Sequence, residues 1–531
     1  MKLNTHTLLN HSEDLKTAGF ELPIFNLQQI KESTKSNPKW IHFGAGNIFR
    51  AYIANCCQTI LNKNAYDCGI LAVETFDNEV ITKAYRPFDN LTALVKTKAS
   101  GEFVKTIVAS IAETVVYTDE KQRIEEAFLN SNLQLVSFTV TEKGYSLHTG
   151  FGKFFPFVEA DIDNGPNGNL AHLVSIITAL LYKRFTQGAA PLAMVSMDNC
   201  SHNGDILKSA VCTIAEAWKG KGFVDERFLN YLNDDHKVSF PLSMIDKITP
   251  RPSESIKQHL AESGLENMDI IVTNKNTYTA GFVNAEFCEY LVIEDKFPNG
   301  RPELEQAGVI FTDRETVNKV ETMKVTTCLN PLHTALAVSG VLLGYQTIWE
   351  EMKDADLVNL VEKIGYEEGL KVVIDPKILS PKTFIDEVLQ ERFPNATIPD
   401  APQRIATDTS QKVGIRFGET IKKYMADDTL SVDELEGIPM ALALWCRYLV
   451  GIDDKGNEMQ LSSDPMLDEL RESLKEAKIG HSVSIAPILG NAKIFNFNIM
   501  ETSVATKAQR YFDFMLAETG NARKALQSLS E

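Results

Sequence analysis

The chain has 531 residues, of which 44% are hydrophobic and 23% are charged, and its formal net charge at pH 7 is −18. This length allows more than one hydrophobic core, whereas the acidic balance argues against nucleic-acid or anionic-membrane partners, which require clustered Lys and Arg. No segment reaches the roughly 20 apolar residues of a membrane span, and no secretory signal follows Met1, so we expect a cytoplasmic protein that binds a small molecule.

A strand, a helix and a second strand are predicted near the N-terminus. Trp40–Phe43 forms a short apolar run that Gly44-Ala45-Gly46 ends abruptly. Over residues 47–61 apolar side chains recur at steps of three and four, which is typical of a helix with one buried face. After a turn over 62–67, the apolar run 69–74 ends at Glu74 and predicts the second strand.

The same alternation continues along the first part of the chain. Further strands are predicted over 133–140, 191–197 and 270–273, and a helix over 170–185. Strands that alternate with helices predict an α/β fold with a doubly wound parallel sheet covered on both faces. From about Val317 the patterns become helical, and the predicted helices span residues 336–352, 357–366, 413–424, 438–450 and 506–517.

The turn after the first strand has the features of a dinucleotide site. Gly44 permits the tight turn, and Gly46 lets the backbone approach a pyrophosphate at the helix N-terminus. Phe49 stands where the general pattern has a third glycine, so two glycines alone are also compatible with a plain strand-to-helix turn. The residues predicted to contact the cofactor are Gly44, Gly46, Asn47, Ile48, Phe49 and Glu74.

Glu74 bears on which dinucleotide binds. A carboxylate at the end of the second strand can accept hydrogen bonds from the adenosine ribose hydroxyls and repels the 2′-phosphate of NADP. The sequence therefore favours NAD. We expect an NAD-binding Rossmann-type domain over residues 1–315 and a mainly α-helical substrate or catalytic domain over residues 316–531.

Several blocks resemble the mannitol dehydrogenase family. The first is HFGAGNIFR at residues 42–50, and a bulky residue in place of the third glycine is usual in that family. The later blocks are TVTEKGY at 139–145, MDN at 197–199, FPLSMIDKITP at 240–250, VIEDKF at 292–297 and MKVTTCLNPLH at 323–333. The resemblance covers about residues 40–416 and implies an NAD-dependent dehydrogenase of polyols or sugar acids.

The resemblance also implies site residues. Oxidation of an alcohol needs a base for the hydroxyl proton and donors for the developing alkoxide, and a buried lysine of lowered pKa can be that base. By resemblance Lys324 is the general acid/base, Asn199 and Asn330 polarise the reacting oxygen, and His333 binds substrate hydroxyls. The predicted substrate-binding residues are Asp246, Lys412, Lys143 and Arg251, of which Lys143 is equally compatible with packing at a strand end.

The block around Lys324 departs from the family pattern. One more residue separates Lys324 from Asn330 than the family usually has, so we expect a distorted helix start that displaces either the lysine or the downstream pair. Pro331 is well tolerated in a first helical turn.

No metal is expected. The eight cysteines contain no C-x-x-C pair, which indicates reduced thiols in a reducing compartment. His42 and His202 have no partner at metal-ligand spacing.

The substrate is left open between a terminal carboxylate and a hydroxymethyl group. A carboxylate calls for a basic clamp, for which Lys143, Arg251, Lys275 and Lys412 are candidates. The segments 196–204 and 330–333 are most similar to family members that interconvert fructuronate and D-mannonate. The alternatives are mannitol 2-dehydrogenase or tagaturonate reductase activity, a non-catalytic sugar or NAD sensor, and an NAD-using epimerase.

Overall fold

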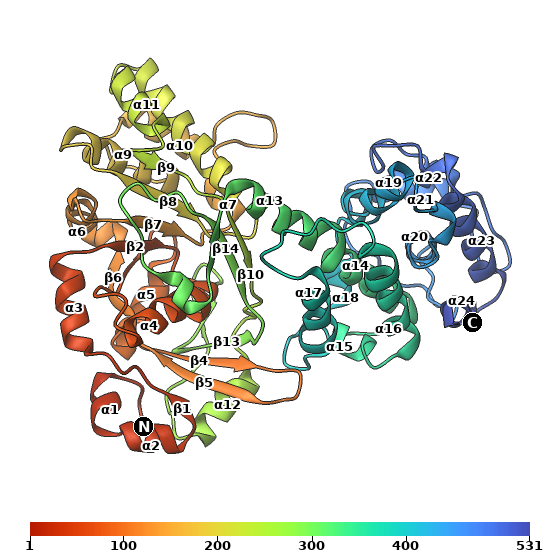
Figure 1. Cartoon of the computed structure of the whole chain (residues 1–531), viewed down its shortest axis with the longest axis horizontal. Coiled ribbons are helices and arrows are strands. Elements are labelled where there is room, and N and C mark those ends of the chain that lie inside the picture. Colours follow the sequence, from red (N-terminus) through yellow and green to blue (C-terminus); the bar gives the residue numbers. More distant parts are fainter. Residues whose placement is uncertain (531) are drawn as a thin grey trace. The chain divides into compact units, whose positions relative to one another are not determined.

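The computed structural model describes residues 1–530, which form two compact units. Unit 1 comprises Met1–Thr97 and Glu102–Asn318, and unit 2 comprises Lys98–Gly101 and the chain from Lys319 onward. Unit 1 contains all the strands, whereas unit 2 is built from helices (Figure 1).

A six-stranded sheet organises unit 1, with the strand order β6-β3-β2-β7-β8-β9 and parallel pairing throughout. Its strands are β2 (Trp40–Phe43), β3 (Ile70–Glu74), β6 (Ile111–Val116), β7 (Leu135–Phe138), β8 (Leu192–Ser196) and β9 (Val238–Ser239). The predicted doubly wound parallel sheet is thereby confirmed. The carboxyl ends of its strands meet at one edge, which is where ligands bind in such folds.

Successive side chains of the sheet enter two different cores. Ile41 and Phe43 pack with α6 (Tyr117–Leu129), α9 (Leu173–Thr186) and α10 (Asn203–Gly220), whereas Trp40 packs with α4 (Ala54–Asn62) on the opposite face. A parallel sheet buried on both faces gives the continuous apolar runs seen in the sequence. The helix predicted over 47–61 begins as a π-helix, η1 (Phe49–Ile53), and continues as α4.

Three smaller sheets were not predicted, and one expected strand lies in one of them. The run 270–273 contains β11 (Ile271–Val272), which pairs with β12 (Tyr278–Thr279) in an antiparallel ladder, so its assignment to the parallel sheet is wrong. So short an apolar run does not identify its partner strand. The other strands are β1 (Phe20–Glu21), β4 (Thr92–Thr97), β5 (Phe103–Val108) and β13 (Phe282–Glu286) in one sheet, and β10 (Ser243–Asp246), β14 (Tyr290–Glu294) and β15 (Ile310–Thr312) in another.

Further helices of unit 1 lie around these sheets. They are α1 (Thr5–Asn10), α2 (Ser12–Thr17), α3 (Leu27–Ser36), α5 (Asn78–Ala84), η2 (Arg86–Phe88), α7 (Glu142–Tyr145), α8 (Pro156–Asn164), α11 (Glu226–Asn233), α12 (Glu254–Glu262) and η3 (Leu304–Ala307). The helix α13 (Arg314–Met323) passes from unit 1 into unit 2.

The main helices of unit 2 differ from the predicted ones mostly at their ends. The helix expected over 336–352 instead begins six residues earlier as α14 (Asn330–Leu343), stops at Gly344 with a φ of +90°, and is followed by α15 (Ile348–Glu351). Most residues of α14 are buried whichever way they face, so an apolar periodicity does not mark its start. Helices also occur at the other four expected places: α16 (Ala355–Glu362) with η5 (Lys363–Gly369), η8 (Gly414–Gly418) with α19 (Glu419–Ala426), α20 (Gly437–Leu449), and α23 (Ser503–Ala517).

The remaining helices of unit 2 are short. They are η4 (Lys324–Cys328), α17 (Pro381–Glu387), η6 (Val388–Arg392), α18 (Pro402–Ile405), η7 (Thr409–Gln411), η9 (Val432–Glu434), α21 (Leu467–Ser473), α22 (Ala486–Leu489), η10 (Ile499–Glu501), α24 (Asn521–Gln527) and η11 (Ser528–Ser530). One segment of the described chain, Arg314–Leu343, is long and apolar enough to cross a membrane by composition, but 83% of its most apolar window is buried inside the protein, as in a core helix.

The centre of unit 2 is α20, which is buried along all of its 13 residues and packs against α14 and α23. Its N-terminus is capped from a distance by Glu368, whose carboxylate accepts the backbone N–H groups of Glu436, Gly437 and Ile438 at 2.7, 2.6 and 2.9 Å. Burial raises the pKa of Glu368 to about 7.

This raised pKa predicts a pH-dependent stability. Because the folded protein binds the Glu368 proton more tightly than the unfolded chain, this group stabilises the fold fully below about pH 4.5, and the contribution fades as the pH rises through about 7. We expect the unfolding free energy of the wild type relative to Glu368→Gln to fall by on the order of 3 kcal/mol across that range. Urea unfolding of both proteins at about pH 5 and pH 8 measures the difference, and a constant difference would contradict the prediction.

Candidate functional site

The loop after β2 is shaped by two different glycines. Gly44 has a φ of +101°, and a Cβ there would lie 2.2 Å from the carbonyl oxygen of Thr139, so only glycine fits. Its N–H donates to the carbonyl of Val73 at 3.0 Å, which ties the loop to the neighbouring strand β3. At Gly46 a Cβ would meet nothing within 4 Å among the described residues. The backbone at Gly46 is therefore open for close approach by a pyrophosphate, as a dinucleotide requires.

Glu74 closes this loop from the end of β3. One carboxylate oxygen accepts the N–H of Ala45 at 3.1 Å, and the other accepts those of Thr75, Phe76 and Asp77 at 3.1, 2.8 and 3.1 Å. Since Oε2 accepts only one of these four bonds, it has a lone pair left for a ribose hydroxyl. Glu74 therefore holds the glycine loop in place and has the capacity expected of a ribose ligand.

The other predicted cofactor residues pack around the loop. Phe49 is fully buried and stacks on His42, with ring centroids 4.0 Å apart, so the bulky residue at the third-glycine position points into the core. Asn47 accepts a hydrogen bond from Arg50 at 2.9 Å, and Ile48 is half-buried. His42 contacts Ser137 and Thr139 through its two ring nitrogens at 2.7 and 2.8 Å, and burial lowers its pKa to about 3. His42 is thus a neutral structural histidine.

An acidic residue that sequence reasoning missed organises the ends of β7 and β8. Asp198 accepts the N–H groups of Val140 and Thr141 at 3.1 and 2.8 Å and the hydroxyl of Tyr145 at 2.6 Å, and burial raises its pKa. Tyr145 is consequently a buried structural residue. The neighbouring Asn199 is exposed.

The remaining site residues predicted in unit 1 lie in three places. Lys143 is exposed on α7. Asp246 ends β10 and is 5% exposed, next to Lys247, whose ammonium group donates to the carbonyl of Glu286 at 2.6 Å and to Glu289 at 2.7 Å. Lys247 was not predicted, because its buried ion pair depends on a partner more than 40 positions away. Arg251 is exposed and its guanidinium lies 4.1 Å from the ring centroid of Tyr278.

In unit 2, Lys324 begins the π-helix η4 and is 5% exposed. Leu329 donates its N–H to the carbonyl of Lys324 at 3.2 Å, five positions back, and its own φ and ψ of −130° and −61° interrupt the helix before Asn330. A π-helical turn is how a helix accommodates an extra residue. The expected distortion between Lys324 and Asn330 is confirmed, and its form is a π-helix followed by a break at Leu329.

His333 lies one turn into α14 in contact with an acid. Its Nε2 is 2.7 Å from a carboxylate oxygen of Asp400, which also pairs with Arg404 at 2.5 Å. Burial lowers the pKa of His333. Although burial of Asp400 acts to raise its pKa, the contacts with His333 and Arg404 bring the net pKa below its usual value. A neutral His333 in contact with an ionised Asp400 follows.

Two cations lie on the segment before α19, and one of them contacts α14 next to His333. Lys412 donates to the backbone carbonyls of Ile405 and Thr407, and Arg416 donates to the hydroxyl of Thr334, beside His333 on α14. Lys412 was predicted as a substrate ligand. Arg416 was missed, although its spacing of four residues from Lys412 was visible in the sequence.

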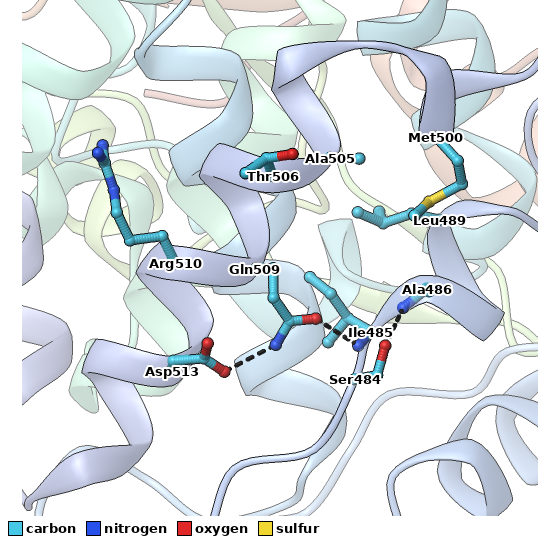
Figure 2. A pocket seen from close by; sticks show the side chains of 10 residues that line it. All are labelled: Ser484, Ile485, Ala486, Leu489, Met500, Ala505, Thr506, Gln509, Arg510 and Asp513. Atoms are coloured by element: carbon cyan, nitrogen blue, oxygen red, sulfur yellow. Dashed lines mark hydrogen bonds between the residues drawn. The ribbon is translucent and has the colours of Figure 1, made fainter.

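Within residues 1–530 a cavity also lies away from these residues. A cavity of about 460 Å³ lies between the segment around α22 and the helix α23 (Figure 2). Gln509 there accepts the N–H of Ile485 at 2.8 Å and donates to Asp513 at 2.7 Å. None of the predicted site residues lines this cavity. The described residues contain no group of three or more His, Cys, Asp or Glu side chains arranged to hold a metal ion, and all eight cysteines are free.

Comparisons with known proteins agree along the whole chain. The mannitol dehydrogenase Rossmann domain matches residues 38–306, and the mannitol dehydrogenase C-terminal domain matches residues 316–513. The D-mannonate oxidoreductase of Thermotoga maritima is 48% identical over 538 aligned positions, which cover 100% of this chain and 99% of that protein. The polyol:NADP oxidoreductase of Gluconobacter oxydans is 28% identical over 88% of this chain and 90% of that protein.

Solved structures share the fold. A D-sorbitol dehydrogenase in substrate-free form superposes with a TM-score of 0.82 at 24% identity, covering 99% of this chain and 100% of that one. The Pseudomonas fluorescens mannitol 2-dehydrogenase in a ternary complex with NAD and D-mannitol superposes with a TM-score of 0.70 at 23% identity, covering 100% and 99%.

Proposed function

The chain belongs to the mannitol dehydrogenase family of oxidoreductases, and we propose that it interconverts fructuronate and D-mannonate with NAD(H). The observation that carries this proposal is the 48% identity to a D-mannonate oxidoreductase over the full length of both chains. Arg416, which contacts the residue after His333, supports it, because a sugar acid brings a carboxylate that this cation can bind.

The dinucleotide is proposed to bind at the loop 44–49 and Glu74. NAD(H), when bound, supplies or takes the hydride. The open backbone at Gly46 fits a pyrophosphate, and the spare lone pair on the Glu74 carboxylate fits a ribose hydroxyl. Since a 2′-phosphate would meet the same carboxylate, we propose NAD rather than NADP. Rates with NADH and NADPH compared side by side test this preference.

The proton chemistry is assigned to Lys324. In ketone reduction its ammonium gives a proton to the carbonyl oxygen, which becomes the hydroxyl, and in alcohol oxidation the neutral amine takes that proton back. The amide groups of Asn330 and Asn199 are proposed to donate to the same oxygen as its negative charge develops. His333, oriented by Asp400, is proposed to bind a substrate hydroxyl, and no metal is required for any of these steps.

We propose that the two predicted domains have different roles. Residues 1–315 are proposed to bind the dinucleotide, with Asp246, Lys143 and Arg251 available to the substrate. Residues 316–531 are proposed to supply Lys324, Asn330, His333 and Lys412. We further propose that the protein acts in the cytoplasm, in keeping with its eight free thiols.

Initial rates of NADH oxidation with fructuronate, tagaturonate and fructose test the proposed function. We expect kcat/KM for fructuronate to exceed that for the other two substrates. Preference for tagaturonate or fructose would identify a tagaturonate reductase or a mannitol 2-dehydrogenase instead. Absence of turnover with all three would favour a sugar or NAD sensor, or an epimerase that retains its cofactor without net release of NADH.

A further inference from the structure

Lys412 and Arg416 form a pair of cations on one helical turn. The N–H of Arg416 donates to the carbonyl of Lys412 at 2.9 Å, so the two side chains are at positions i and i+4 and share a face. Both side chains are partly buried. Like charges so placed repel one another unless an anion lies between or beside them.

Neither cation has an acidic partner within ion-pair distance in the described part of the chain. Lys412 donates to two backbone carbonyls, and Arg416 donates to the hydroxyl of Thr334. Two of the nearby acids are engaged elsewhere, since Asp400 pairs with His333 and Arg404, and Asp464 accepts the N–H and hydroxyl of Ser410 at 2.8 and 2.5 Å. The guanidinium of Arg416 therefore keeps N–H groups available for a ligand.

The surroundings make this arrangement unfavourable without an anion. Burial lowers the pKa of Arg416 to about 10. Burial and the charge of Arg416 lower the pKa of Lys412, with smaller opposing contributions from Asp408 and Asp464. A cation that loses hydration without gaining a carboxylate destabilises the free protein, and such groups are characteristic of binding sites.

We propose that Arg416, together with Lys412, binds the terminal carboxylate of a sugar-acid substrate and so sets the preference for keto-acids over uncharged ketoses. This inference rests on the proposed function and deepens it. Arg416 contacts Thr334, the residue after His333, and its charge acts on the His333 ring, so a carboxylate bound by Arg416 lies near the histidine that is proposed to hold a substrate hydroxyl. A planar guanidinium can bind both carboxylate oxygens, whereas a hydroxymethyl group gives it one weak acceptor.

The experiment compares Arg416→Met and Arg416→Lys with Lys422→Met, a control that removes a cation paired with Glu419 on the neighbouring helix. For Arg416→Met we expect kcat/KM for the preferred keto-acid to fall about 100-fold, mostly through KM, and kcat/KM for fructose to change less than about threefold. Arg416→Lys keeps part of the preference because it keeps the charge. Lys422→Met leaves both substrates unchanged.

Each outcome decides the proposal. Equal losses for keto-acid and fructose, or no loss for either, overturn the role of Arg416 while leaving the proposed function intact. If the wild type instead prefers fructose, the proposed function fails, and the carboxylate site is judged by inhibition of fructose reduction by D-mannonate. Inhibition at least tenfold weaker in Arg416→Met supports the site, and equal inhibition overturns it. Thermal unfolding of each variant checks that the fold is preserved.

Discussion

Replacement of Lys324 by alanine is expected to lower kcat for ketone reduction by about 10³-fold while NADH affinity stays within about twofold of the wild type. The side chain is 5% exposed and begins the π-helix η4, so the substitution removes a buried amine from a fixed position. Without it the carbonyl oxygen must take its proton from water, which is neither positioned nor charged. Single-turnover rates with bound NADH measure the loss.

Two comparisons separate proton transfer from a general loss of structure. Methylammonium added to Lys324→Ala should enter the space left by the side chain and restore part of the rate, whereas Lys324→Met fills that space and should not respond. Lys371→Met, which removes an exposed cation paired with Glu434, serves as the charge control and should retain full activity. A rate above about a third of wild type in Lys324→Met would exclude the lysine as the proton donor.

The first strand, helix and strand of unit 1 were predictable because several local signals agree. Trp40–Phe43 is buried on both faces, and Gly44 carries a positive φ at the turn. The start of α14 was not predictable from periodicity, because most residues of that helix are buried and the preceding π-turn changes backbone hydrogen bonding without changing the hydrophobic pattern. Resemblance placed Lys324 and Asn330 but could not specify the geometry of the residues between them.

The residues that sequence reasoning missed share one property. Asp198 and Lys247 lie within the blocks at 197–199 and 240–250, but their roles depend on hydrogen bonds to distant residues that those blocks do not reveal. Arg416 is recognisable only once Asp400 and Asp464 are seen to be engaged with other partners. A buried charge points to a binding site when no group of opposite charge pairs with it, and the absence of such a partner can be seen only in the three-dimensional structure.

Substitution by alanine should affect different properties at the two glycines of the loop after β2: stability at Gly44 and NADH binding at Gly46. Gly44→Ala places a Cβ 2.2 Å from a backbone oxygen at a φ of +101°, so either the loop or β7 must move, and we expect a loss of unfolding free energy above about 3 kcal/mol. Gly46→Ala meets no described atom within 4 Å, so its stability should stay within about 1 kcal/mol of wild type. The Cβ at Gly46 instead occupies space that a pyrophosphate needs, and NADH should bind about tenfold or more weakly.

Gly101→Ala separates the effect of φ from that of steric contact. Its φ is +85°, yet a Cβ there meets nothing within 4 Å in the described chain, so it reports the strain of a left-handed backbone alone, about 1 kcal/mol. Urea unfolding without cofactor and fluorescence titration with NADH measure the two properties for all three variants. If Gly44→Ala is no less stable than Gly101→Ala, the close packing of the loop against Thr139 is contradicted. If Gly46→Ala binds NADH as tightly as the wild type, the pyrophosphate does not approach the backbone there, and the assignment of the loop as the dinucleotide site fails.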